Sequence, residues 1–398
     1  MKRIIFVFTL TVSYFIKSYS QTAERSMDKL INENLFFAAQ QYKLLQKNTP
    51  DTLMPRSYDI TQNKMVTSNT KWWCSGFFPG TLWYIYEYTK DEEIKKIAEN
   101  RLSILEKEKH FTGNHDLGFM MYCSFGNAFR ITGNPAYKEA VTTAAGSLAT
   151  RYRPSIKSIQ SWNKNERLNC PVIIDNMMNL ELLYWVSDHG GDSKFRDIAV
   201  AHANSTIKNH FRPDNSSYHV LDYDLNTGEI IKKVTWQGAA DSSAWSRGQS
   251  WGLYGFTMMY RFSKNKAYLK QARKIANFLM NHPNLSSDKI PYWDYNAMSI
   301  PKANRDASAG AIMASAFLEL GQYVKKAERK KLVAAAEVII RSLSSEEYLS
   351  KPGENGGFLI KHNVGSLPHK SEVDVPLTYA DYYFVESLLR YKNWYLKK

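Results

Sequence analysis

Apolar residues recur with helical spacing along almost the whole chain after about residue 24. Several segments share one layout: a helix rich in aromatic and small residues, a short polar turn, and then an Ala-rich amphipathic helix. This self-similarity predicts an internal repeat of helical hairpins that pack against their neighbours. The short turns are Thr89-Lys90-Asp91, Thr132-Gly133-Asn134-Pro135, Gly190-Gly191-Asp192 and Lys264-Asn265-Lys266.

The repeat predicts about six hairpins. Their first helices begin near Ser75, His115, Ile174, Trp245, Ala307 and Leu377. The last of these helices has no partner, and neither does the helix from about Ala23 to Leu45. If these two pack side by side, about twelve helices close into a ring. We therefore expect an all-α fold, an (α/α)6 barrel or toroid, and no linker divides it into two domains.

The connectors between hairpins are much longer than the turns within them. They cover residues 46–72, 152–172, 211–244, 283–306 and 344–376. Because short and long connectors alternate, all the long ones should lie at one end of the ring. Long loops usually carry function, so we expect the site at that end. Residues 217–235 alternate in polarity around Asn226-Thr227-Gly228, which predicts a β-hairpin.

Composition narrows the class of partner. Of the 398 residues, 14% are aromatic, and flat aromatic faces suit stacking on sugar rings, although an aromatic-rich core explains the same content. The net charge of +14 favours anionic partners. No block of five or six Lys/Arg and no nucleic-acid motif occurs, so we expect no nucleic-acid partner. An acidic polysaccharide remains the attractive partner.

The first twenty residues resemble a secretory signal peptide. Lys2 and Arg3 precede an apolar run over residues 4–16, and Ser18-Tyr19-Ser20 resembles a small-x-small cleavage site. The run is too short to span a bilayer comfortably, and no later segment is long enough, so we expect no membrane partner. We therefore expect a signal peptide over residues 1–20 and one domain over residues 21–398, secreted across the inner membrane to the periplasm.

The three cysteines, Cys74, Cys123 and Cys170, form no CxxC motif. Their odd number argues against a disulfide framework or a zinc site, so we expect free, mostly buried thiols. Nothing else in the sequence has the spacing of metal ligands, and we expect no metal site.

Two aspartates stand at the starts of apolar helices. Asp116 lies in His-Asp-Leu-Gly-Phe, and Asp175 follows Val-Ile-Ile and precedes Asn-Met-Met-Asn. A helix N-cap explains Asp116 about as well as a catalytic role does. At Asp175 a cap is a poorer explanation, because an apolar run precedes the residue. Neighbouring helix starts could bring both carboxyl groups to one mouth. Two facing carboxylates raise the pKa of one of them, which suits the acid–base chemistry of glycoside cleavage.

A second group of polar residues precedes and opens the helix after residue 244. Arg247 and Trp251 are four residues apart, hence on one helical face, and a guanidinium beside an indole suits an acidic sugar. A structural cation–π pair is the alternative. His219 and Gln237 lie in the preceding long connector and on spacing alone could be ordinary surface residues.

These residues fall within motifs that resemble the unsaturated glucuronyl hydrolases, glycoside hydrolase family 88. The resemblance runs in order from about Asn32 to the C-terminus, and it is specific because many motifs agree. The motifs are Trp73-Cys-Ser-Gly-Phe-Phe-Pro-Gly, His115-Asp-Leu-Gly-Phe, Asp175-Asn-Met-Met-Asn, Tyr218-His-Val, Gln237-Gly, Ser246-Arg-Gly-Gln-Ser-Trp, Pro291-Tyr-Trp-Asp-Tyr, Arg305-Asp-Ala-Ser-Ala and Tyr379-Ala-Asp-Tyr-Tyr-Phe.

The resemblance implies an (α/α)6 barrel with no metal or organic cofactor. It implies substrates with a 4,5-unsaturated uronic acid at the non-reducing end, left by polysaccharide lyases on glycosaminoglycans. Asp175 matches the catalytic acid and base. Asp116 matches the partner carboxylate that positions the substrate and tunes Asp175. The residues that match sugar-binding positions are Trp73, His115, His219, Gln237, Arg247 and Trp251, with Trp162 as a looser match.

The implied chemistry is hydration of an enol ether. Protonation of C4 gives a cation at C5 that the ring oxygen stabilises; water adds at C5, and the hemiketal opens and releases the glycosidic link. The chain departs from the family in one place. Members that favour sulfated substrates carry Ser-x-x-Ser-x-Lys, where this chain has Ser366-Leu-Pro-His369-Lys370-Ser371. Ser366, His369 and Lys370 are therefore the candidates for a sulfate contact.

Three alternatives remain from the sequence. One is the sister enzyme that cleaves unsaturated rhamnogalacturonan fragments, and another is a lyase on an α/α toroid. The third is a non-catalytic, acidic-glycan-binding protein, which would have no reason to place Asp175 in an apolar helix start. We expect a monomer or a weak oligomer.

Overall fold

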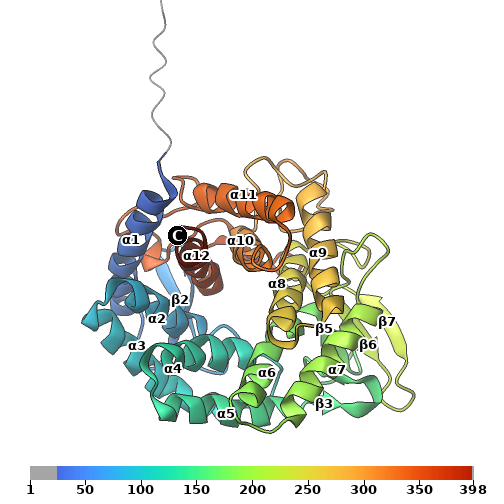
Figure 1. Ribbon diagram of the computed structural model, residues 1–398. Helices are drawn as coiled ribbons and strands as arrows, with labels where there is room; N and C mark the ends of the chain where they lie inside the picture. Colours follow the sequence, from blue (N-terminus) through green and yellow to red (C-terminus); the bar gives the residue numbers. More distant parts are fainter. Residues whose placement is uncertain (1–24, 397–398) are drawn as a thin grey trace, which may run out of the picture.

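The computed structural model describes residues 25–396 and forms a barrel of two concentric rings of helices (Figure 1). The outer ring contains α1 (Met27–Lys47), α3 (Glu92–Leu105), α5 (Pro135–Ala149), α7 (Lys194–Asn209), α9 (Lys266–Asn281) and α11 (Lys326–Leu343). The inner ring contains α2 (Phe77–Thr89), α4 (Asn127–Thr132), α6 (Leu180–Asp188), α8 (Ser246–Ser263), α10 (Ala307–Leu320) and α12 (Thr378–Tyr391). This is the expected (α/α)6 barrel.

Burial follows from the two rings. Every residue of α10 and of α12 is buried, because inner helices are covered all round. The outer helix α9 instead buries one stripe, which includes Tyr268, Ala272 and Ile275. The barrel therefore has a continuous core between the rings.

Helix α1 closes the ring beside α2 and α12, as the sequence predicts (Figure 1). It begins at Met27 rather than near Ala23, because Ser26 is the N-cap and its side chain accepts a hydrogen bond from the backbone N–H of Lys29. The predicted signal peptide lies outside the described residues.

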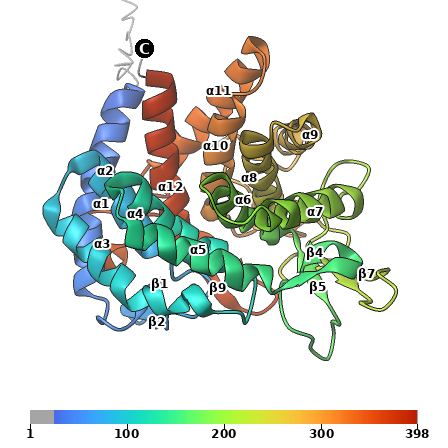
Figure 2. The same ribbon diagram turned by 60° about the horizontal axis from the view of Figure 1, so that its bottom comes forward.

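The long connectors carry short antiparallel strands, which Figure 2 shows together at one end of the barrel. The predicted hairpin is confirmed: β6 (Val220–Tyr223) pairs with β7 (Ile230–Val234). The sequence did not predict β5 (Pro171–Ile173), which joins them as a third strand. It also missed the pairs β1 (Met54–Asp59) with β2 (Lys64–Ser68), β3 (Tyr152–Arg153) with β4 (Ser158–Ile159), and β8 (Asn363–Ser366) with β9 (Ser371–Val375).

Two inner elements start with irregular turns that position the candidate site. A π-helix (Gly118–Gly126) precedes α4, and a 3-10 helix (Ile174–Met178) precedes α6. Short π-helical segments are frequent at functional sites.

The cysteines are free and buried, as expected. Within residues 25–396, no helix is long and apolar enough to cross a membrane. In the same range, no group of three or more His, Cys, Asp or Glu residues is arranged to hold a metal ion.

Candidate active site

A small cavity of about 80 Å³ lies at the strand-bearing end of the barrel. Long connectors and the starts of inner helices supply its walls. The lining residues are Trp73, His115, Asp116, Trp162, Ile173, Asp175, Gln237 and Arg247. The sequence predicts all of them except Ile173 as site residues, and the fold brings them together from six separate stretches of chain.

The segments that carry the two aspartates are joined directly to each other. Asn179, four residues after Asp175, accepts a hydrogen bond from the backbone N–H of Phe119 at 3.0 Å. Gly118 permits this approach, because a Cβ atom at this position would lie 2.5 Å from the Cα of Asn179. Asp116 and Asp175 are thus held at fixed places on two adjacent inner elements.

Neither aspartate caps a helix with its side chain, because neither carboxyl group accepts a capping hydrogen bond from a backbone N–H group of the described residues. The residues at the cap positions of the two elements are Leu117 and Ile173, and their side chains make no capping hydrogen bond. Asp116 is 7% exposed and Asp175 is 9% exposed, so both carboxyl groups are nearly buried. Asp116 does stand at a helix start, since its carbonyl accepts a hydrogen bond from the N–H of Met120 at 2.9 Å, but its buried carboxyl group does not act as the cap.

Burial perturbs both carboxyl groups. It raises the pKa of Asp175 to about 7, against lowering contributions from the charge of Arg247 and from the indole of Trp251. Burial, together with the negative charge of Asp175, raises the pKa of Asp116 to about 8. The sequence predicts a raised pKa for one of the two carboxyl groups; in the structure burial raises both. The pair therefore keeps a transferable proton at neutral pH.

His219 faces Asp175 as a neutral donor. Its Nδ1 accepts hydrogen bonds from the backbone N–H groups of Trp236 and Gln237, at 3.1 and 3.2 Å, so we assign the ring proton to Nε2. That Nε2 lies 3.7 Å from Oδ2 of Asp175, and neither atom has a hydrogen-bond partner among the described residues. Burial holds the pKa of His219 well below its ordinary value. Such unsatisfied buried atoms need a partner, and a ligand can supply one.

His115 stands beside Asp116 in a similar way. Its Nε2 lies 3.4 Å from Oδ1 of Asp116, and burial lowers the pKa of the imidazole to about 3, so the ring is neutral. Its backbone N–H donates to the carbonyl of Ser161, which ties it to the loop that carries Trp162. The buried Arg151 fixes the same loop through hydrogen bonds to the carbonyls of Gln160 and Ser161.

Arg247 lines the cavity but is already engaged by protein groups. Its guanidinium pairs with the buried Asp306 at 2.8 Å and donates to the carbonyl of Gly365 at 2.6 Å. It also lies over the rings of Trp245 and Tyr379, 4.5 and 5.3 Å from their centroids. Asp306 therefore positions Arg247, while the guanidinium still brings positive charge to Asp175.

Trp251 does not offer a face to a sugar, contrary to the expectation from the sequence. Its side chain is fully buried, with its ring packed against Phe119 and Tyr383 at centroid distances of 5.1 and 5.3 Å. Helical spacing puts it on one face of α8 with Arg247, but of these two residues only Arg247 lines the cavity. Its contribution to the site is to lower the pKa of Asp175.

The predicted sulfate segment borders the cavity. Gln237 donates its Nε2 hydrogen to the carbonyl of Gly365 at 3.0 Å, and Gly365 precedes Ser366. The Oγ of Ser366 and Nδ1 of His369 are hydrogen-bonded at 2.7 Å. Lys370 is exposed in a left-handed turn, with φ of 50°, and does not line the cavity.

Sequence reasoning missed Arg151, Trp236 and Asp306. Asp306 stands in the recognised motif Arg305-Asp-Ala-Ser-Ala, so a pairing with Arg247 could have been suspected. Arg151 carries no signal in sequence, because its acceptors are backbone carbonyls. Trp236 directly precedes Gln237, and its ring lies 5.7 Å from that of Trp162.

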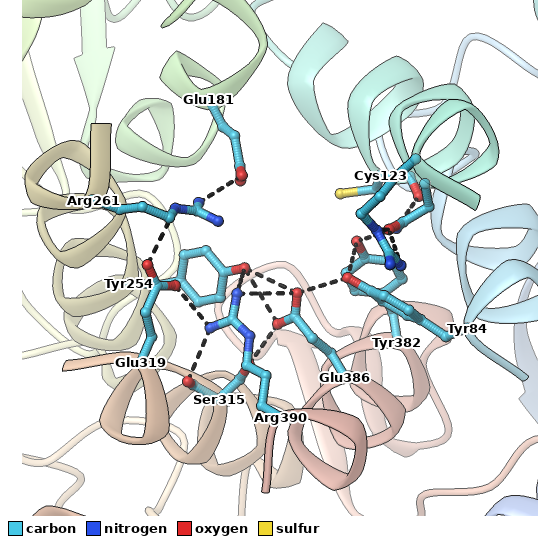
Figure 3. Close-up of polar contacts among 12 residues, drawn as sticks. Tyr84, Cys123, Glu181, Tyr254, Arg261, Ser315, Glu319, Tyr382, Glu386 and Arg390 are labelled. Carbon is cyan, nitrogen blue, oxygen red and sulfur yellow. Dashed lines mark hydrogen bonds and ion pairs between the residues drawn. The ribbon is translucent and has the colours of Figure 1, made fainter. Parts of the chain in front are cut away.

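A second cavity, of about 260 Å³, lies inside the barrel between inner helices, and its charged groups pair with one another. Figure 3 shows Arg261 reaching Glu181 and Arg390 reaching Glu386. Glu386 also accepts hydrogen bonds from Tyr84 and Tyr254. The charged residues that line this cavity are ion-paired, whereas Asp175 and His219 at the first cavity keep facing atoms without a hydrogen-bond partner, so the candidate active site is the smaller cavity.

Comparison with known proteins decides the family. The family model described as Glycosyl Hydrolase Family 88 matches residues 45–394. The chain belongs to this family. Its relatives in family 88 include an unsaturated glucuronyl hydrolase of Formosa agariphila, 44% identical over 345 residues, or 86% of each chain. An unsaturated chondroitin disaccharide hydrolase of Streptococcus pyogenes is 34% identical over 336 residues, covering 83% of each.

Solved structures of family 88 have the same fold. An unsaturated glucuronyl hydrolase specific for heparin is 43% identical, with a TM-score of 0.89 over 92% of this chain and 98% of that one. The unsaturated glucuronyl hydrolase of Bacillus sp. GL1 is 30% identical, with a TM-score of 0.84 over 92% and 96%. The resemblance read from the motifs is thereby confirmed, and so is the barrel.

Proposed function

We propose that this family 88 hydrolase removes the 4,5-unsaturated uronic acid from the non-reducing end of lyase-generated glycosaminoglycan oligosaccharides. One observation carries the proposal. Asp175 is a buried carboxyl group with a pKa raised to about 7, and it faces the cavity beside the neutral donor His219. A group that is half protonated near neutral pH can both give and take a proton.

Hydration of the double bond needs only this exchange. Asp175 in its acid form gives its proton to C4 of the enol ether, and the ring oxygen stabilises the positive charge at C5. Water then adds at C5 and returns a proton to the Asp175 carboxylate. The hemiketal opens to a ketone, and C1, which now carries a free hydroxyl, releases the second sugar. One water is consumed, and the enzyme is restored.

The surrounding charges support an acidic substrate. Arg247 supplies a fixed positive charge to the cavity, and two neutral histidines, His115 and His219, supply hydrogen-bond donors without repelling a proton from Asp175. Asp116 remains protonated at neutral pH, so it can donate a hydrogen bond to a sugar hydroxyl or carboxylate. Trp73 and Trp162 line the same cavity and provide the apolar walls.

Relatives indicate the substrates to test. Named relatives act on chondroitin disaccharides, and one solved relative is specific for heparin. The variant of the Streptococcus agalactiae enzyme in one solved structure holds dGlcA-GalNAc6S. We propose unsaturated disaccharides of this class as substrates, and a monomer or weak oligomer as the active form.

The test is the loss of ultraviolet absorbance from the conjugated double bond. Purified protein is incubated with unsaturated disaccharides from chondroitin, hyaluronan, heparin and pectin. We expect turnover of at least one glycosaminoglycan fragment. Turnover of the pectin-derived fragments alone would favour the rhamnogalacturonan activity, and binding without loss of absorbance would favour a glycan-binding protein.

We further propose that the protein is exported to the periplasm after cleavage of residues 1–20. The charged start, apolar run and small-x-small site of that segment support export. A periplasmic hydrolase would meet oligosaccharides that lyases release outside the cytoplasm.

A further inference from the structure

The mouth of the cavity continues outward along a row of aromatic rings. Trp162 lines the cavity and contacts His219 on one side, with ring centroids 6.3 Å apart. On the other side it contacts Trp236 at 5.7 Å. Trp236 in turn stacks on His369 at 5.3 Å, with an angle of 29° between the rings. The row thus leads from Asp175 to solvent.

This row lies where a second sugar must lie. The unsaturated ring has to enter the cavity to reach the buried Asp175, so the sugar attached to it occupies the mouth. Trp236 and Trp162 are half-buried there, while His369 is exposed. The residues at the mouth can therefore distinguish substrates by the substituents on the second sugar.

Arg167 brings an uncompensated positive charge to the mouth. Its guanidinium lies over the ring of Trp236, 4.8 Å from the centroid, and the side chain is exposed. No carboxylate among residues 25–396 lies within ion-pair distance of it. A guanidinium packed on an indole face keeps its planar edge available, and that edge matches the oxygens of a sulfate or carboxylate.

The loop that carries Arg167 is fixed before any ligand arrives. The side chain of Asn165 accepts hydrogen bonds from the backbone N–H groups of Arg167 and Leu168, at 2.9 and 3.0 Å. Lys232 donates its Nζ hydrogen to the carbonyl of Arg167 at 2.6 Å. Leu168 is buried in a small cluster against which Trp162 and Trp236 pack. A fixed loop lowers the entropy lost on binding.

We propose that Arg167, held over Trp236, binds a sulfate group on the sugar next to the unsaturated uronic acid. The inference rests on the proposed hydrolase function and names a specificity residue outside the Ser366 segment. We assign the Ser366 hydroxyl as the donor to Nδ1 of His369, which puts the ring proton on Nε2 and makes His369 a second donor to the anion. Arg167 and His369 thus form an anion contact beside the segment from Ser366 to Ser371, in which the chain departs from the family motif.

The experiment compares two unsaturated disaccharides that differ by one sulfate on the second sugar. For each, kcat/KM is measured with wild type and with Arg167→Gln from the loss of ultraviolet absorbance. We expect the ratio of sulfated to unsulfated kcat/KM to fall about tenfold in the variant, the effect of one charge-assisted contact at an exposed site. Added salt should shrink the wild-type ratio, because an exposed pair is screened.

Lys164→Gln is the matched control, because Lys164 is an exposed cation three residues earlier in the same loop. It should leave the ratio at the wild-type value. Arg167→Lys should give an intermediate ratio, since it keeps the charge and loses the planar fork. The proposal is overturned if Arg167→Gln keeps the wild-type ratio, or if Lys164→Gln lowers it equally. Wild type inactive on both disaccharides would instead refute the hydrolase function itself.

Discussion

Replacing Asp175 by Asn should make the protein more stable at alkaline pH, although it removes activity. Burial raises the pKa of Asp175 from 3.8 to about 7 in the folded protein. Between these two values the folded state holds the proton more tightly than the unfolded state, so wild-type stability falls as the pH rises from about 4 to 7. Asn cannot ionise and is spared this loss.

The size of the effect follows from the two pKa values. One pKa unit corresponds to about 1.4 kcal/mol, so a rise from 3.8 to about 7 corresponds to roughly 4 kcal/mol above pH 7. The buried amide of Asn costs about 1–3 kcal/mol if one of its N–H groups finds no acceptor. At pH 5 about 1.2 of these pKa units, or roughly 1.6 kcal/mol, are already lost in wild type, so we expect Asp175→Asn to lie within about 1 kcal/mol of wild type there and to be about 1–3 kcal/mol more stable at pH 9.

The assay is urea unfolding followed by tryptophan fluorescence at both pH values. Asp197→Asn is the matched control, because Asp197 is exposed on α7 and its replacement should change stability equally at pH 5 and pH 9. If Asp175 were a structural carboxylate that is ionised in the folded protein, its replacement by Asn would lower the free energy of unfolding at both pH values. If Asp175→Asn loses as much stability at pH 9 as at pH 5, the strained acid–base role of this residue is wrong.

Three further predictions concern other residues. Asp116→Asn should slow turnover at least about tenfold. The decline of kcat/KM above pH 7 should remain, because the pKa of Asp175 is about 7 and Asp116 is still protonated at that pH. A pH profile that moves by more than about one pH unit in the variant would contradict this. Arg247→Ala should lower the free energy of unfolding by about 3–5 kcal/mol, since Asp306 is left buried without its cation; wild-type stability on urea unfolding would refute the pairing. N-terminal sequencing of protein from the native periplasm should start near Gln21, and an intact Met1 in soluble cytoplasm would count against export.

The sequence predicts the barrel well because its pattern is local. Helical spacing, short polar turns and long connectors repeat along the chain, and the ring follows from their number. The pairing of β1 with β2, and of β8 with β9, was missed because these strands are short, and in β2 and β9 no clear alternation of buried and exposed residues marks them. They are held in part by contacts across the chain, such as the bridge between Ser57 and Leu377 and the ion pair between Arg56 and Glu372.

The site is also predicted in part, because some of its residues carry a local signal in the sequence. Residues at helix starts, such as Asp116 and Asp175, carry a signal because a polar group interrupts an apolar run. The burial of Trp251 carries none, since spacing gives the face of a helix but not what covers it. The partners of Arg247 and the place of Arg167 depend on which loops meet, and only the structure supplies that.

The most direct test of the account compares an unsaturated glycosaminoglycan disaccharide with its saturated counterpart. Wild type should consume the unsaturated one, with loss of double-bond absorbance in step with release of the second sugar, and should leave the saturated one intact. Folded Asp175→Asn should lose at least about 10²–10⁴-fold in turnover. Cleavage of the saturated disaccharide at a comparable rate, or an Asp175→Asn protein within about tenfold of wild type, would contradict hydration by Asp175.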